Sequence, residues 1–130
     1  MSQVTGPLSI NDGSATPVAK SFQPERVAPD SSSFTERSSG VSAGFSRFQI
    51  GLSPANSNRP TNRIDLSLDL PVLQTVNGVS TVAYVCRFKG YFVLPDVATA
   101  ADRANARAFV ANALNNSQVI SVIRDLDPLY

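Results

Sequence analysis

A strict alternation of polar and apolar residues over eight positions constrains the fold most. From Arg63 to Leu70 each even-numbered residue is Ile or Leu, and each odd-numbered one is Arg, Asp or Ser. Successive side chains of an extended chain point to opposite sides, so a period of two predicts a β-strand with one dry and one wet face. The chain is therefore expected to contain a sheet of which only one side is covered.

Two further segments alternate in the same way. One runs from Arg47 to Ser53, and the other from Thr81 to Leu94. The loops expected between the three segments, Pro54–Pro60 and Pro71–Ser80, are short. Consecutive strands joined by short loops are most simply antiparallel neighbours. The dry face is expected to hold Phe48, Ile50, Leu52, Ile64, Leu66, Leu68, Phe88 and Phe92.

The first part of the chain predicts a hairpin and a short edge strand. Asn11-Asp12-Gly13 has the composition of a tight turn between two extended runs, so residues 4–22 are expected to form a β-hairpin. Residues 31–46 are rich in Ser but contain Phe34 and Phe45, which favours a short edge strand. The sheet is expected over about residues 33–94.

After Pro95 the apolar period becomes helical. Thr99 with Asp102 three residues on resembles a capping box, and Ser117 is expected to cap a second helix that Pro128 stops. Both helices, within about residues 99–127, are expected to be amphipathic. The whole chain is thus expected to be one α+β domain, residues 1–130: an N-terminal β-hairpin, an antiparallel sheet and two C-terminal α-helices.

Composition argues against catalysis. The 130 residues include no His and one Cys, which removes the commonest general base and metal ligand. We therefore expect no enzyme, metal, cofactor or small-molecule substrate. Cys86 is interpreted as core filler on the apolar face. No apolar run is long enough to span a membrane and no signal peptide is recognisable, so we expect a soluble protein without a membrane partner.

The dry face poses a packing problem that predicts a homodimer. It spans at least three strands, whereas each helix has an apolar stripe only three or four residues wide. A partner's helices are the economical cover, because a monomer rarely exposes so large an apolar patch. The alternative is a monomer that covers itself. The expected interface residues are Phe92, Phe109, Val110, Leu114, Ile120 and Ile123.

Several segments, in order and spacing, resemble the coat proteins of single-stranded RNA bacteriophages of the levivirus type. The most specific are the strand end and helix entry at residues 91–99, the helix segment at residues 107–110 and the tail at residues 123–130, which closes on a Tyr. The alternating strand that ends at Pro71 and the turn at Asp12-Gly13 are similar too.

The resemblance implies a five-stranded antiparallel sheet and helices that lie on the partner's sheet in an obligate dimer. Such dimers form icosahedral shells, typically T=3, that enclose genomic RNA. The loop from Pro71 to Ser80 would gather around the symmetry axes, with Thr75, Val76, Asn77 and Gly78 as its inter-subunit residues. The implied location is the virion, assembled in the bacterial host cytoplasm, and the phage maturation protein is an implied partner.

The wet face is the expected RNA-binding surface. Arg and Lys contact phosphates, Gln and Ser bond to base edges, and Tyr stacks an unpaired base. The alternative is an ordinary solvated sheet face. The resemblance also implies an RNA hairpin that makes the coat a translational repressor of the replicase. The expected RNA-binding residues are Arg47, Gln49, Arg63, Asp65, Ser67, Arg87, Lys89 and Tyr91.

Three functions follow from these observations. The first is a capsid subunit that packages single-stranded RNA. The second is a dimeric RNA-binding regulator that forms no shell. Such a regulator is expected to have a more basic surface than a net charge of +1 gives. The third is an enzyme, for which only Asp65 and Asp69 pair as carboxylates, without other groups around them.

Overall fold

In the computed structural model, which describes residues 3–129, the chain divides into two compact units, Met1–Val93 and Leu94–Tyr130. The first unit contains the strands. They form a six-stranded sheet in which each strand lies beside its neighbours in sequence. Their bounds are β1 Leu8–Asn11, β2 Ala19–Val27, β3 Ser31–Glu36, β4 Ser46–Ser53, β5 Thr61–Val76 and β6 Val79–Pro95.

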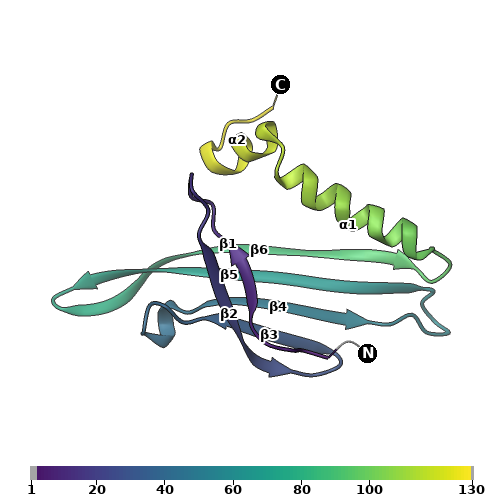
Figure 1. Ribbon diagram of the computed structural model, residues 1–130, viewed down its shortest axis with the longest axis horizontal. Coiled ribbons are helices and arrows are strands. Elements are labelled where there is room, and N and C mark those ends of the chain that lie inside the picture. Colours follow the sequence, from purple (N-terminus) through teal and green to yellow (C-terminus); the bar gives the residue numbers. More distant parts are fainter. Residues whose placement is uncertain (1–2, 130) are drawn as a thin grey trace. The chain divides into compact units, whose positions relative to one another are not determined.

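The expected fold class is confirmed, with a difference in strand count. The first half of β2 pairs with β1 as the N-terminal hairpin, and its second half pairs with β3. Because one strand serves both parts, β2–β6 make up the five-stranded sheet and β1 adds a sixth strand. Figure 1 shows the β1–β2 hairpin running at a steep angle to β4, β5 and β6.

The expectation of an edge strand in residues 31–46 is wrong. β3 lies between β2 and β4 and pairs with both. It is internal because β2 continues past the hairpin and covers its outer side. Phe34 and Thr35 are accordingly buried, and the Phe34 ring lies 6.5 Å from that of Phe48. The rest of the segment is a loop with a short 3-10 helix, η1 Ser42–Gly44.

The β4–β5 register confirms the two faces. Phe48 lies opposite Leu68, and Ile50 lies opposite Leu66, on one side of the sheet. Between these apolar pairs, Gln49 lies opposite Ser67. Because side chains alternate along a strand, the polar pairs project from the other side.

The second unit contains the two helices, α1 Ala100–Leu114 and α2 Ser117–Asp125. The capping box is present: the Asp102 amide donates to Thr99 Oγ1 at 3.2 Å, and the Asp102 carboxylate accepts from the Thr99 amide. α2 is capped by Asn116 and not by Ser117, since Asn116 Oδ1 accepts from the Gln118 amide at 2.9 Å.

Two helix expectations need correction. α2 ends at Asp125, before Pro128, where Leu126 turns the chain with a left-handed backbone (φ 55°). α1 is only weakly amphipathic, because alanines occur all around it. The stripe of Phe109, Val110 and Leu114 lies exposed on the single chain.

The buried core of the single chain is small. Phe22 and Phe34 are its buried hydrophobic residues among those described, at 5% and 4% exposure. Cys86 is exposed, so its interpretation as core filler is wrong for the single chain. It occupies β6 on the apolar side, where nothing in the sheet itself covers it.

Candidate RNA-binding face

The odd-numbered side chains of β4, β5 and β6 converge on one side of the sheet, here called the polar face. Gln49 and Ser67 lie opposite each other, and Ser67 Oγ lies 3.4 Å from Gln49 Oε1. Arg47 lies opposite Asp69. The structure therefore brings together the eight residues predicted from sequence as the RNA-binding set: Arg47, Gln49, Arg63, Asp65, Ser67, Arg87, Lys89 and Tyr91.

β2 adds two charged residues to the polar face that were not predicted, because the expected hairpin ends at residue 22 and β2 continues to Val27. The β2–β3 register shifts between Pro24 and Arg26, which leaves Glu25 as the extra residue. Both charged neighbours reach the polar face: Glu25 contacts Arg47, and Arg26 Nη1 donates to Ser31 Oγ at 2.9 Å. The sequence signal was Pro24, because a proline inside a strand often marks a bulge or an edge.

The polar face carries three ion pairs. Arg47 holds Glu25 with two contacts, Nε to Oε2 at 3.0 Å and Nη2 to Oε1 at 3.2 Å. Arg63 Nε lies 2.9 Å from Asp65 Oδ1. The hydrogen bond from Arg47 lowers the pKa of Glu25 below its ordinary value, and burial opposes this only in part. Glu25 is therefore ionised at neutral pH.

The third pair joins β5 to β6, where Arg87 Nε lies 3.5 Å from Asp69 Oδ1. On the same side, the guanidinium of Arg63 lies 4.1 Å from the centre of the Tyr91 ring. A cation over a ring face at this distance is attracted by the ring quadrupole, which holds Arg63 against Tyr91.

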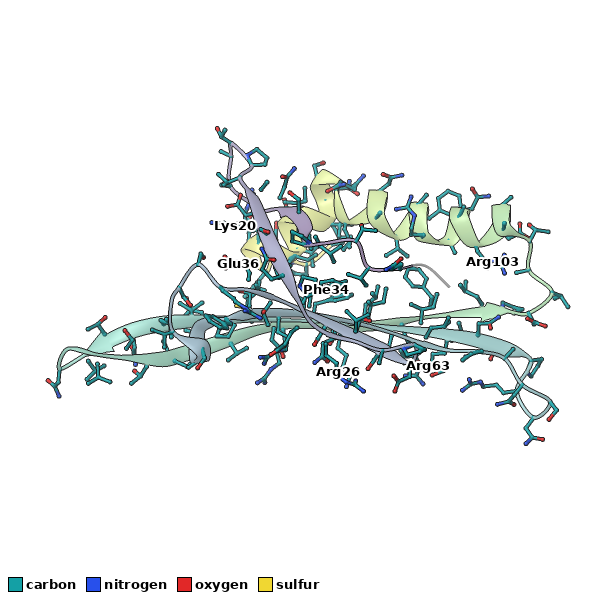
Figure 2. All side chains as sticks on the ribbon, turned by 60° about the horizontal axis from the view of Figure 1, so that its bottom comes forward. Lys20, Arg26, Phe34, Glu36, Arg63 and Arg103 are labelled. Atoms are coloured by element: carbon teal, nitrogen blue, oxygen red, sulfur yellow. The ribbon has the colours of Figure 1, made fainter. Side chains whose placement is uncertain are left out.

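The charge balance of the polar face is modest. Arg26 and Lys89 have no carboxylate within 4.0 Å among residues 3–129. The strands thus present five cations against three carboxylates on this face, a net charge of +2. Figure 2 shows Arg26 and Arg63 on one side of the sheet and Phe34 on the other.

The polar face is hollowed along its middle. A shallow depression of about 600 Å³ runs from Ser31 and Gln49 on one side to Arg87 and Lys89 on the other. Its floor includes Ser67, and both donors and acceptors line it. Along this depression, Arg and Lys can bind phosphate oxygens, and Ser and Gln can hydrogen-bond to base edges.

The opposite side of the sheet and the helices are rich in exposed apolar side chains. Of the expected interface residues, Phe92 is half-buried and the other five are exposed on the single chain. Phe109 is 73% exposed. The five are Phe109, Val110, Leu114, Ile120 and Ile123.

The β5–β6 hairpin tip is tighter than expected. A ten-residue loop was expected at Pro71–Ser80, but β5 continues to Val76 and β6 begins at Val79. The two strands are therefore joined by a two-residue turn, Asn77-Gly78. Both turn residues have positive φ, 52° and 78°. Asn-Gly suits a type I′ turn, in which the backbone twist matches that of the two flanking strands, and this explains why the strands extend so far.

Within residues 3–129, no three His, Cys, Asp or Glu side chains are grouped so as to hold a metal ion. In the same part of the chain, no helix has the length and apolar character needed to cross a membrane.

Comparison with known proteins identifies the family. Residues 3–130 match the family described as Levivirus coat protein. The virus-like particle of bacteriophage ESE058 is 30% identical, with a TM-score of 0.84 over 98% of this chain and all of that one. For the virus-like particle of Beihai levi-like virus 21, identity is 20% and the TM-score is 0.87, over 98% of this chain and 99% of that one.

The bacteriophage GA protein capsid shares the fold at 15% identity, with a TM-score of 0.77 over 96% of this chain and 97% of that one. No curated protein matches the sequence. The family match over almost the whole chain and the agreement in fold lead to one conclusion: the chain belongs to the levivirus coat protein family.

Proposed function

We propose that this coat protein dimerises and that its dimers assemble into an icosahedral shell around single-stranded RNA. The observation that carries the proposal is the division of the sheet into a polar face and an exposed apolar face. The relatives described as virus-like particles support assembly. The role is structural, without catalysis.

Dimerisation would cover the apolar side. Only two phenylalanines form the described hydrophobic core of the single chain. The exposed apolar side chains add to the stability of the fold only if a second surface covers them. A twofold partner supplies the same helices and the same sheet in return. We propose that Phe92, Phe109, Val110, Leu114, Ile120 and Ile123 lie in this interface, and that the partner covers Cys86 as well.

RNA contact would use the polar face, turned to the inside of the shell. Its net charge of +2 is small for one chain, but a shell multiplies it by the number of subunits. Tyr91, with one side against Arg63, offers a stacking surface for a base. RNA retention is therefore expected to weaken as salt rises.

The finer roles are proposals on the same basis. A T=3 shell would place the β5–β6 hairpin tip, with Thr75, Val76, Asn77 and Gly78, around the symmetry axes. Binding of one RNA hairpin by the polar face would make the protein a translational repressor of the replicase. The maturation protein would join the virion in the bacterial cytoplasm, where assembly takes place.

Expression of the protein alone tests the proposal. Size-exclusion chromatography and negative-stain microscopy should show megadalton particles that protect RNA from nuclease. A stable small dimer that binds RNA would instead support the alternative, a regulator that forms no shell.

A combined variant tests the polar face. Replacing Arg47, Arg63, Arg87 and Lys89 by Gln should reduce the RNA content of assembled particles. An unchanged RNA content would refute the assignment of this face to the interior.

A further inference from the structure

A row of alternating charges crosses the polar face. It runs from Glu25 on β2 to Arg47 on β4, Asp69 on β5 and Arg87 on β6. Arg47 holds Glu25 at 3.0 and 3.2 Å, and Arg87 holds Asp69 at 3.5 Å. Arg47 and Asp69 lie directly opposite each other in the β4–β5 register. The row is neutral and matches two of the five cations on this face, and Asp65 matches a third, Arg63.

The bulge in β2 places Glu25 and its neighbour Arg26 on the same face of the sheet. In a regular strand, two consecutive side chains point to opposite sides, so Glu25 and Arg26 would not share a face. Glu25 follows the alternation set by Gln23, which lies opposite Thr35, and the extra residue brings Arg26 to the same side. Ser33 Oγ lies 3.5 Å from the Glu25 carboxylate that Arg47 contacts. Bulges commonly re-aim a side chain where a surface has a function.

We propose that Glu25 is an internal competitor for RNA phosphate: it occupies the guanidinium of Arg47 and thereby sets how tightly single chains or dimers bind single-stranded RNA. This inference rests on the proposed function of the polar face. A phosphate that binds the Arg47 guanidinium must displace the Glu25 carboxylate, which makes two contacts with it. The unassembled protein then binds RNA weakly, and strong retention requires many contacts at once, as in a shell.

The salt dependence gives a signature of this exchange. When a phosphate of single-stranded RNA binds an unpaired Arg or Lys side chain, a counterion of the nucleic acid is released. Each such contact makes the plot of log affinity against log salt steeper by about 0.7. When the phosphate displaces Glu25 from Arg47, the freed carboxylate stays beside the phosphate, so the net charge that the nucleic acid meets there is zero and few counterions are released. The Arg47 contact therefore adds almost nothing to the slope while Glu25 is present.

The test measures binding of a fluorescent 20-nucleotide oligouridylate to full-length protein at concentrations where no particles form, between 50 and 200 mM NaCl. Glu25→Gln should bind about fivefold tighter at 50 mM, because an exposed ion pair contributes up to about that factor. Its slope should be steeper by about 0.7. The steeper slope should disappear in Glu25→Gln combined with Arg47→Gln.

Glu36→Gln is the matched control. It removes the same charge from β3, on the other side of the sheet, where Glu36 accepts from the Ser38 amide at 2.9 Å. Its slope should equal that of the wild type. Should Glu25→Gln fail to fold, Asp69→Asn frees Arg87 in the same row and should steepen the slope in the same way.

The outcomes separate the inference from the proposed function. If the wild type binds RNA and Glu25→Gln keeps the wild-type slope, Glu25 does not compete and the inference fails alone. If Glu36→Gln steepens the slope as much, net charge explains the effect and the inference also fails. If neither the wild type nor any variant binds RNA, both the proposed function and the inference are contradicted.

Discussion

Replacing Phe109 by Ala tests whether α1 faces a partner. The side chain is 73% exposed on the single chain. A Phe side chain buries on the order of 200 Å², so about 150 Å² would remain for a partner to cover. At roughly 25 cal/mol per Å², covering it contributes nearly 4 kcal/mol per chain and about 7.5 kcal/mol for the two copies in a dimer.

The variant should leave the monomer fold intact, since Ala favours helix and the lost side chain is mostly exposed. Dimer affinity should fall by about five orders of magnitude, because each 1.4 kcal/mol is a factor of ten. Sedimentation equilibrium of unassembled protein measures this directly. Arg103→Ala, a charged and exposed residue of the same helix, is the control and should change dimer affinity little.

An equal dimer dissociation constant for Phe109→Ala and wild type would refute the burial of Phe109 in the interface. It would mean that this part of α1 stays in water in the assembly. The cover for the apolar side of the sheet would then have to come from α2, whose Ile120 and Ile123 are also exposed.

Three further predictions concern the fold around the two faces. A Cβ on Gly44 would lie 2.5 Å from Leu73 Cδ1, so Gly44→Ala should lower the free energy of unfolding by about 1–3 kcal/mol in urea titrations, and Leu73→Ala should abolish this effect. Hydrogen bonds from Ser14 and the Val18 amide lower the pKa of Asp12 from 3.8 to about 2, so the turn is fully stabilised above pH 3.8 and loses this stabilisation as the pH falls through about 2. The difference in melting temperature between wild type and Asp12→Asn should therefore shrink between pH 4 and 2; a constant difference would contradict this. Arg59 donates to the carbonyls of Ser53, Pro54 and Thr61 at 3.0–3.3 Å, so Arg59→Ala should speed hydrogen exchange in the loop at residues 54–60, and unchanged exchange would show that the loop is held by other contacts.

The alternation of residues predicted the two faces of the sheet because the side-chain period of a strand is two and does not depend on the rest of the fold. Every odd-numbered residue predicted on β4–β6 reaches the polar face for this reason. Glu25 and Arg26 were missed because the expected hairpin ends at residue 22, whereas β2 continues to Val27, and the bulge after Pro24 then changes the parity so that Arg26 reaches the same face as Glu25.

Tertiary pairing decided the other differences. Nothing local in residues 31–36 shows that β2 continues far enough to cover β3, so an internal strand was expected at an edge. Cys86 alternates with apolar residues, which predicts a core position, yet its side chain is exposed because no other strand covers that side of the sheet. At the start of α2, Asn116 and Ser117 are adjacent candidates for the N-cap. Asn116 is the cap in the structure, and the sequence does not decide between them because Asn and Ser are about equally favoured at this position.

In the proposed particle, one side of the sheet meets RNA and the other meets protein. Tyr84 and Tyr91 lie on the same strand, β6, and are 60% and 61% exposed on the single chain. Tyr91 lies against Arg63 on the polar face, whereas Tyr84, three residues from Arg87, projects from the opposite side. Ultraviolet cross-linking of RNA-containing particles, followed by mass spectrometry, should attach RNA to Tyr91 and leave Tyr84 unmodified. RNA on Tyr84 with none on Tyr91 would contradict the account.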